Sequence, residues 1–358
     1  MSAARTVAAT LALTLALLLG LAAALEIHFV DVGQGDGVLI ALPDGRHVVV
    51  DAGNADGAML HYLRATGVTA IALAIASHPH ADHIGGMRDV IDAFPPPFVL
   101  DNGLAHTTLT FERYLDAVEA SGAALLEPTA RTLTLGDVRL HVLPPPRERA
   151  WGHNDNSVGV IVEYGAFRAS LTGDAEARLF DWWIDTVPEQ LGDVHVHKAS
   201  HHGSANGDTH EALARLRPEV VVVSVGADNR YGHPDPGTLA MYERHGAALY
   251  RTDHHGTVVI QAASDGSYTV TTERAPPPGA RATDGVHQPD ATFADDVCID
   301  INTAPSELLQ AIVHVGPERA GEIVHLRPFA SLDALHRVPG IGPARLRDIR
   351  DEGLACVE

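Results

Sequence analysis

Cysteine is scarce in this chain of 358 residues, which contains only Cys298 and Cys356. Neither lies near the histidine-rich segments, so a metal site built on thiolates is not indicated there. Basic residues are also few, since 25 Lys and Arg stand against 46 Asp and Glu, for a formal charge of -21. An acidic surface argues against avid nonspecific binding of nucleic acid by electrostatics alone. Apolar runs long enough to span a bilayer are missing after the N-terminal segment, which argues against a channel or a transporter.

The N-terminal residues 1–24 consist of one Arg followed by a long apolar run that ends in Ala22-Ala23-Ala24. This pattern resembles an export signal with an A-x-A-like cleavage site. The run also has the length, about 18 residues or more, of an uncleaved membrane anchor, and a buried core helix is a third interpretation. We expect an extracytoplasmic protein that is secreted, periplasmic or anchored at the outer face of the membrane. Contact with the membrane is expected only if the segment stays uncleaved.

Three further segments follow. Residues 25–272 alternate apolar strand patterns with amphipathic helix patterns, which predicts a layered α/β domain. Within it, 248–261 is predicted to supply strands and 84–94 to form one helix. Residues 273–297 carry Pro, Gly and charge without an apolar period, which predicts a linker. Residues 298–358 contain short helices with turns at HVGPER and VPGIGPAR, which predicts a small all-α domain.

The densest group of possible metal ligands lies in SHPHADHIGG, residues 77–86, after an apolar run. His78 and His80 alternate in an extended segment, so their rings point to one side of the chain. Asp82 and His83 begin the following helix and can face a second point nearby. Imidazole and carboxylate ligands without thiolate suit zinc or manganese at a hydrolytic site. The segment therefore predicts a metal site.

The pattern H-x-H-x-D-H in this segment resembles the signature of the metallo-β-lactamase fold family, and VVVDAG, SLTGDAE and KASHHGS match further family segments across the first domain. The resemblance implies a four-layer αββα sandwich. It also implies that Asp51 orients the histidine loop and that Asp174 bridges two metal ions. By the same resemblance one ion takes His78, His80 and Asp174, and the other takes Asp82, His83, Asp174 and His202.

The sequence departs from the family between the first cluster and Asp174. Many members have another histidine there, whereas this chain reads WGHNDNSVGVIVEYG. His153, Asn154, Asn156 or water completes the first site in this interpretation. An Asn-rich turn that binds no metal is the alternative.

Two divalent ions, zinc or alternatively manganese, would suit hydrolysis. Ions about 3.5–4 Å apart hold a bridging hydroxide and polarise a phosphoryl or carbonyl oxygen, so neither a nucleophilic Ser or Cys nor a nucleotide cofactor is required. The candidate catalytic residues are Asp82, at the metals, and His201 and His233, which can grip phosphate oxygens or protonate the leaving group. A turn histidine without function is the alternative for His233.

Three further segments narrow the resemblance to one subgroup of the family. DVGQGDGVLI, NSVGVIV and NRYGHP, in order with the metal segments, resemble the extracytoplasmic hydrolase domain of competence DNA-uptake (ComEC-like) proteins. That resemblance implies degradation of nucleic acid, DNA above all, by a stand-alone exported domain. The glycine-rich loop in DVGQGD can bring Gln34 and Asp36 towards the metal cleft, or it is an ordinary hairpin turn.

The C-terminal turn VPGIGPARL places Gly340 and Gly342 before a helix whose first N–H groups can bind an anion. It resembles a helix-hairpin-helix module, which implies binding of the DNA backbone; the partner turn keeps only Gly316 of the usual glycine pair. Six Arg, no Lys and nine Asp or Glu in this segment predict a shallow salt dependence. A packing or protein-contact hairpin is the alternative. Cys298 and Cys356, at the two ends, form a disulfide or remain unlinked thiols.

Three functions are consistent with these patterns. The first is a metal-dependent phosphodiesterase that cleaves nucleic acid. The second keeps the metals but acts on a small phosphodiester, lactone or β-lactam, which the acidic charge favours. The third is a surface DNA-binding protein with an inactive hydrolase domain, which the intact ligand set opposes.

Overall fold

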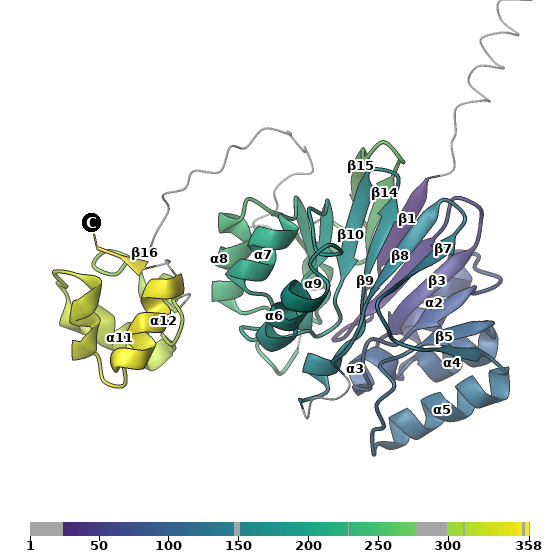
Figure 1. The fold of residues 1–358 in the computed structure, drawn as a ribbon, viewed down its shortest axis with the longest axis horizontal. Coiled ribbons are helices and arrows are strands. Elements are labelled where there is room, and N and C mark those ends of the chain that lie inside the picture. The colour runs from purple at the N-terminus through teal and green to yellow at the C-terminus, as the bar shows by residue number, and fades with distance from the viewer. Residues whose placement is uncertain are drawn as a thin grey trace, which may run out of the picture.

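The computed structural model describes residues 24–146, 151–227, 229–275, 299–310, 312–352 and 355–357 (Figure 1). The predicted targeting segment lies outside these residues except for Ala24, as do residues 276–297 of the predicted linker and Cys298. Among the described residues, no helix combines the length and the apolar character that a membrane crossing requires.

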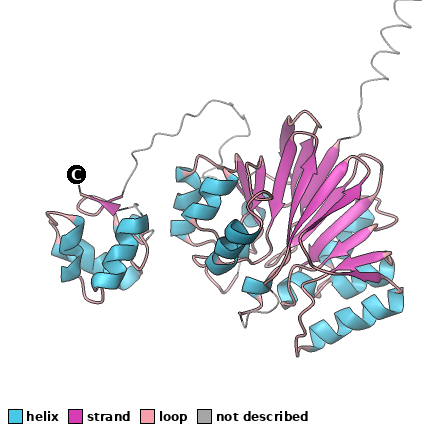
Figure 2. Ribbon diagram, viewed as in Figure 1, coloured by secondary structure: helices cyan, strands magenta, loops and turns pink. Residues whose placement is uncertain are grey.

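Two β-sheets form the centre of the first domain (Figures 1 and 2). Within the described residues, the first sheet has eight strands in the order β15-β14-β1-β2-β3-β4-β5-β6. Pairing is antiparallel from β15 to β3 and parallel from β3 to β6. The strands are β1 (Leu25–Phe29), β2 (Gly37–Ala41), β3 (His47–Ala52), β4 (Leu73–Ile75), β5 (Phe98–Leu100), β6 (Ala124–Leu126), β14 (Val258–Ala262) and β15 (Tyr268–Thr272).

The second sheet has seven strands in the part of the chain described, in the order β13-β12-β11-β10-β9-β8-β7. Pairing is parallel from β13 to β10 and antiparallel from β10 to β7. The strands are β7 (Arg131–Leu135), β8 (Val138–Leu143), β9 (Gly159–Tyr164), β10 (Phe167–Leu171), β11 (Val196–Lys198), β12 (Val220–Val223) and β13 (Ala248–Arg251).

Helices cover the outer faces of both sheets, which confirms the αββα sandwich. In β3, Val48 and Val50 face the core between the sheets, whereas Val49 packs under the helices. Because successive strand residues point to opposite faces, a strand buried on both sides is apolar throughout. The helices are α2 (Ala58–Ala65), α3 (Ala81–Ile84), α4 (Met87–Ala93) and α5 (Leu109–Ser121) on the first sheet, then α6 (Ala177–Thr186), α7 (His210–Leu216) and α8 (Pro236–Arg244) on the second, with short turns η1 (Asn154–Asn156), η2 (Ser200–Gly203) and α9 (Thr252–His255).

One element differs from the sequence prediction. The helix predicted over 84–94 is broken between α3 and α4, because Gly85 and Gly86 lie against the backbone of β3 and the loop after it; a Cβ on Gly86 would come within 2.3 Å of the Ala52 carbonyl oxygen. The segment 248–261 supplies strands, as predicted. Its two ends belong to different sheets, and α9 makes the crossing between them.

The C-terminal segment folds around its own apolar core. Its elements are β16 (Ile299–Asp300), α10 (Ser306–Leu309), α11 (Pro317–Leu326), η3 (Leu332–Arg337), α12 (Pro343–Glu352) and β17 (Ala355–Cys356). The prediction of helices is confirmed, and a short parallel ladder between β16 and β17 joins the two ends of the segment. Cys356 is disulfide-bonded, which agrees with the first of the two alternatives for the cysteines.

Candidate metal centre

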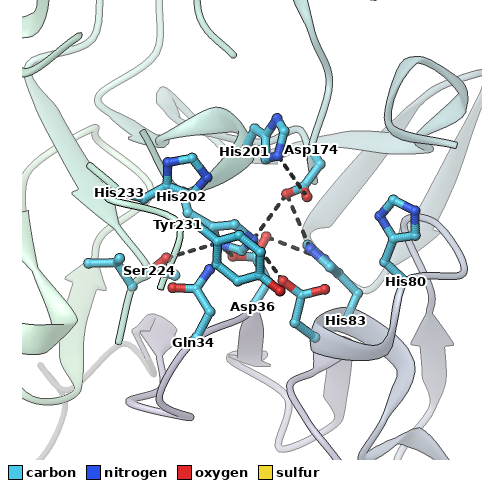
Figure 3. A network of polar contacts seen from close by, with 12 residues as sticks. Gln34, Asp36, His80, His83, Asp174, His201, His202, Ser224, Tyr231 and His233 are labelled. Carbon is cyan, nitrogen blue, oxygen red and sulfur yellow. Dashed lines mark hydrogen bonds and ion pairs between the residues drawn. The ribbon is translucent and has the colours of Figure 1, made fainter. Parts of the chain in front are cut away.

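The predicted metal ligands come together where strands of both sheets end (Figure 3). His78 and His80 follow β4 of the first sheet, and Asp82 and His83 lie on α3. The second sheet contributes Asp174 after β10, and His201 and His202 in η2 after β11. The carboxyl ends of parallel strands are the usual place for such groups in α/β folds.

Two groups of ligand atoms share Asp174. In the first, one atom each from His78, His80 and Asp174 lie within 4.8 Å of one another, and the same holds for Asp82, His83 and His202 in the second. The Oδ2 atom of Asp174 lies 3.6 Å from Nε2 of His78. Its Oδ1 atom lies 3.2 Å from Nε2 of His83 and 3.4 Å from Nε2 of His202. One carboxylate therefore faces both groups, as a bridging ligand must.

The second group fits a divalent cation. Nε2 of His83, Nε2 of His202 and Oδ1 of Asp174 are buried and have no hydrogen-bond partner. Such atoms cost stability unless something binds them. Two ligands about 2.0–2.2 Å from a tetrahedral zinc lie about 3.3–3.6 Å apart, and Oδ1 of Asp174 lies close to this range from the two imidazole nitrogens, at 3.2 and 3.4 Å. The donor set is imidazole and carboxylate, which suits zinc or manganese.

Asp51 orients the histidine loop. Its Oδ1 atom accepts a hydrogen bond from the Ser77 amide at 2.8 Å, and its Oδ2 atom contacts the Ser77 hydroxyl at 2.6 Å and Nδ1 of His83 at 2.8 Å. A carboxylate on Nδ1 fixes the tautomer that leaves Nε2 free to bind a metal. Asp51 thus positions a ligand without being one, as the resemblance implied.

The loop containing DVGQGD reaches the site and is not an ordinary hairpin turn. The amide of Asp36 donates to the carbonyl oxygen of Asp82 at 3.0 Å. Gly35 has φ of 137°, and a Cβ there would lie 2.1 Å from the same oxygen, so only glycine fits. The carboxylate of Asp36 lies 3.3 Å from Nδ1 of His202, which also contacts the carbonyl oxygen of Ser224 at 2.9 Å.

Sequence reasoning missed Lys198, the single lysine of the chain. It lies on β11 with 1% of its surface exposed, forms an ion pair with Asp36, and donates to the carbonyl oxygen of Gly173 at 2.9 Å. Burial disfavours its charge, but Asp36 and Asp174 outweigh burial and raise its pKa. A cation is therefore fixed beneath the ligands. The sequence did contain a signal for this residue, because the one lysine of the chain lies within the ligand segment KASHHGS.

Burial, the neighbouring carboxylates and the neighbouring histidines together shift the pKa values of the predicted ligands in opposite directions. Burial opposes a charge on His202, but the carboxylates of Asp174 and Asp36 raise its pKa to about 9. Against the same burial, Asp174 and Asp51 hold the pKa of His83 well above its usual range. Burial, together with His83, instead lowers the pKa of His78 well below its ordinary value. A metal ion must therefore displace protons from the second group more than from the first.

The first group has additional neighbours. His201 lies with Nε2 3.8 Å from Oδ2 of Asp174 and Nδ1 3.4 Å from Glu176. The His153 ring lies 5.7 Å from the His80 ring, and its Nδ1 atom is buried without a hydrogen-bond partner. Asn154 donates to Glu176 at 3.0 Å, also contacts His201, and keeps a buried oxygen unpartnered. His153 and Asn154 thus remain alternatives for completing this group.

Three further residues lie near the two ligand groups: His233, Asn156 and His106. His233 lies beside His201 and His202, with ring centroids at 5.5 and 6.4 Å, which puts it at the rim of the site. Asn156 donates its amide nitrogen to the carbonyl oxygens of Trp151 and Gly152, whereas its buried Oδ1 atom has no hydrogen-bond partner, so Asn156 also remains an alternative. His106, which the sequence analysis did not single out, lies 4.5 Å from His153, ring to ring.

The helix-hairpin-helix glycines differ from one another. Gly340 has φ of 85°, in the left-handed region that favours glycine, and it precedes α12. Gly316 is extended with φ of -80° before α11, and Gly342 is exposed. Two guanidinium groups lie at the Gly340 turn. Arg345 donates to the Gly340 carbonyl oxygen at 2.8 Å, and a Cβ on Gly340 would lie 3.1 Å from the side chain of Arg319.

Comparisons with known proteins agree with both parts. Residues 30–226 match the metallo-beta-lactamase superfamily, and residues 295–352 match the helix-hairpin-helix motif. The chain is 27% identical over 254 residues to ComE operon protein 3 of Bacillus subtilis, covering 65% of this chain and 32% of that protein. It is 25% identical over 247 residues to Recombination protein 2 of Haemophilus influenzae, covering 67% and 29%. The chain thus spans about a third of the length of these relatives.

Two further similarities are more limited. A deoxyribonuclease of a Thioalkalivibrio species is 41% identical over 61 residues, or 17% of each chain. Among solved structures, the metallo-beta-lactamase fold protein YhfI from Bacillus subtilis aligns with 67% of this chain and all of its own, at 13% identity and a TM-score of 0.47. With its sequence match over residues 30–226 and its two-sheet fold, the chain belongs to the metallo-beta-lactamase superfamily.

Proposed function

We propose that this hydrolase is a metal-dependent phosphodiesterase that cleaves nucleic acid outside the cytoplasm. The observation that carries the proposal is the pair of ligand groups sharing Asp174 in a chain that also has a helix-hairpin-helix motif. The names of two relatives, a deoxyribonuclease and ComE operon protein 3, are compatible with this proposal. The proposed location rests on residues 1–24 alone, whose composition resembles an export signal.

The residues around the predicted metal ligands can contribute different steps of phosphodiester hydrolysis. Two bound divalent ions would supply Lewis-acid charge and lower the pKa of water to about 7. His201 and His233, at the rim, are placed to contact phosphate oxygens or to protonate the leaving oxygen. Burial and the neighbouring His201 lower the pKa of His233, so neutral His233 would contact phosphate by hydrogen bonding.

The test is a nuclease assay of the purified protein. It is supplied with Mn²⁺ or Zn²⁺ and given single- and double-stranded DNA and RNA in parallel. We expect cleavage with added metal and none after dialysis against a chelator, with activity restored when metal is returned. Intact substrates in every metal condition would refute the proposal.

A small substrate is the second candidate, because a formal charge of -21 repels a polyanion. A panel of chromogenic phosphodiester, lactone and β-lactam substrates separates the two. Hydrolysis of this panel at rates far above those on any nucleic acid would favour the small substrate.

Metal binding is expected to strengthen as pH rises. His202, with its pKa raised to about 9, holds a proton at neutral pH that an ion must displace. Each displaced proton weakens the apparent affinity about tenfold per pH unit below that pKa. The apparent Kd for Mn²⁺, measured by competition with a chelating dye, should therefore fall about tenfold or more from pH 7 to pH 8. The dye titrated alone is the control, and a Kd that does not change with pH would contradict this ligand set.

DNA binding by the C-terminal motif is expected to depend on the Gly340 turn. Gly340→Val forces a side chain into a left-handed conformation and against Arg319. On the Asp174→Ala background, which prevents cleavage, we expect about tenfold weaker binding of a labelled duplex by fluorescence anisotropy. Gly321→Ala on α11, where a Cβ meets open space, is the matched control. Equal affinities for both variants would favour a packing role for this hairpin.

A further inference from the structure

A pocket opens beside the second ligand group. Its volume is about 380 Å³, and Asp82 forms part of its wall. The remaining polar lining comes from three loops: Gln34 from the glycine-rich loop, Asn54 from the loop after β3, and Asn229, Arg230 and Tyr231 from the loop before α8. A group bound here would therefore lie next to a substrate phosphate at the ligands.

Tyr231 presents an exposed aromatic ring to this pocket. Its side chain is 55% exposed, although large apolar residues are normally covered. The ring lies nearly parallel to that of His233, at an interplanar angle of 14° and a centroid distance of 5.9 Å. The guanidinium of Arg230 lies 5.3 Å from the ring centroid and donates to the Tyr231 hydroxyl at 3.3 Å. An aromatic ring and a cation thus stand together at the rim of the metal centre.

The loop that carries Tyr231 is held in place by Asn229. The Oδ1 atom of Asn229 accepts hydrogen bonds from the amides of Tyr231 and His233, at 3.2 and 3.0 Å. Its Nδ2 atom donates to the carbonyl oxygens of Gly226 and His233, at 2.9 and 2.8 Å. Because one side chain satisfies four backbone groups, the backbone of this loop is held in place before a ligand arrives, which lowers the entropic cost of binding.

Gln34 supplies a free donor in the same pocket. Its Oε1 atom accepts from the Gly226 amide at 3.3 Å, whereas its Nε2 atom is buried and has no hydrogen-bond partner. Figure 3 shows the Gln34 side chain beside the Tyr231 ring. A ligand with acceptor atoms at its edge would satisfy this donor.

We propose that this pocket is a nucleobase subsite, in which the nucleotide next to the scissile phosphate stacks on Tyr231 and accepts a hydrogen bond from Gln34. The inference rests on the proposed function and specifies its substrate as single-stranded nucleic acid. A base inside a duplex is already stacked on its neighbours and cannot enter such a pocket without being extruded. Stacking also explains how an acidic protein binds a polyanion, since the attraction to a base does not depend on net charge.

The test compares Tyr231→Ala and Tyr231→Phe with the wild-type protein. Substrates are a short single-stranded DNA, the matching RNA, the DNA with abasic sites throughout, and the duplex. Stacking is worth about 1–3 kcal/mol per base, or roughly 5- to 150-fold. We expect Tyr231→Ala to raise KM for the single strands by this factor with kcat within about twofold, and Tyr231→Phe to restore KM. Phe98→Ala, at an exposed aromatic ring on β5, is the matched control.

The abasic strand separates a base subsite from a structural role. The wild-type protein should cleave it with the raised KM of the alanine variant, and Tyr231→Ala should not raise that KM further. An unchanged KM for base-bearing strands, or an equal loss on abasic ones, would overturn the subsite. If the wild-type protein cleaves no nucleic acid, the proposed function fails; equilibrium binding of a labelled trinucleotide then decides, since affinity insensitive to Tyr231→Ala overturns the inference.

Discussion

Asp174→Ala is expected to lower metal-dependent hydrolysis by about 10³-fold or more. Its two oxygens face the two ligand groups separately, so one substitution removes a ligand from each. Metal ions in such sites supply several kcal/mol of transition-state stabilisation, and about 4 kcal/mol corresponds to 10³-fold in rate. The measurement is kcat/KM on the best substrate, together with metal content per chain.

Asp185→Ala is the control for Asp174, because Asp185 is an exposed carboxylate on α6. It should retain both activity and metal. Thermal unfolding of the metal-free proteins shows whether Asp174→Ala still folds. Cleavage that survives in a folded, metal-depleted variant would refute the assignment of Asp174 and point to a contaminating nuclease.

Lys198→Met is expected to destabilise the first domain by about 3–5 kcal/mol, the cost of leaving one partner of a buried ion pair alone. Asp36 would remain buried at 3% exposure with two further carboxylates, Asp51 and Asp174, near its lost partner. For a domain of this size the loss corresponds to a fall in Tm of roughly 6–20 °C. Differential scanning calorimetry measures it.

Two further variants show whether the loss of stability in Lys198→Met comes from the buried charge. Arg88→Met removes an exposed cation from its pair with Asp92 and should change stability by less than about 1 kcal/mol. Lys198→Met combined with Asp36→Asn removes both charges and should recover part of the loss, because no uncompensated charge then stays buried. A double variant as unstable as the single one would show that packing of the lysine stem, not its charge, matters.

The ligand segments could be predicted because each is short and contiguous. His78, His80, Asp82 and His83 lie within six positions, where local geometry alone brings them near one another. The apolar strands around them could also be predicted from the sequence, because a strand such as β3 that is buried on both faces is apolar throughout. Local pattern was sufficient for a layered α/β domain and for the ligand cluster in residues 77–86, whereas the αββα order of the layers and the roles of Asp174 and His202 came from the family resemblance.

What could not be predicted depends on contacts between distant segments. Asp36 and Lys198 meet only because the glycine-rich loop after β1 lies against the end of β11 in the other sheet. His201 and His202 have φ of 48° and 55°, a backbone conformation that no local pattern marked. Likewise, the exposure of Tyr231 follows from the hydrogen bonds of Asn229, whose partners come from the folded loop.

The burial of Lys198 has a consequence for chemical labelling. The chain has no other lysine, and this one is 1% exposed and charged. Acylation of an amine requires its uncharged, exposed form, so the folded protein offers such reagents no accessible side-chain amine. Modification of Lys198 therefore requires opening of the metal centre, and its rate, followed by mass spectrometry, measures how often β11 separates from the glycine-rich loop. Bound metal should slow that reaction, which makes the sole ε-amine a built-in reporter of site occupancy.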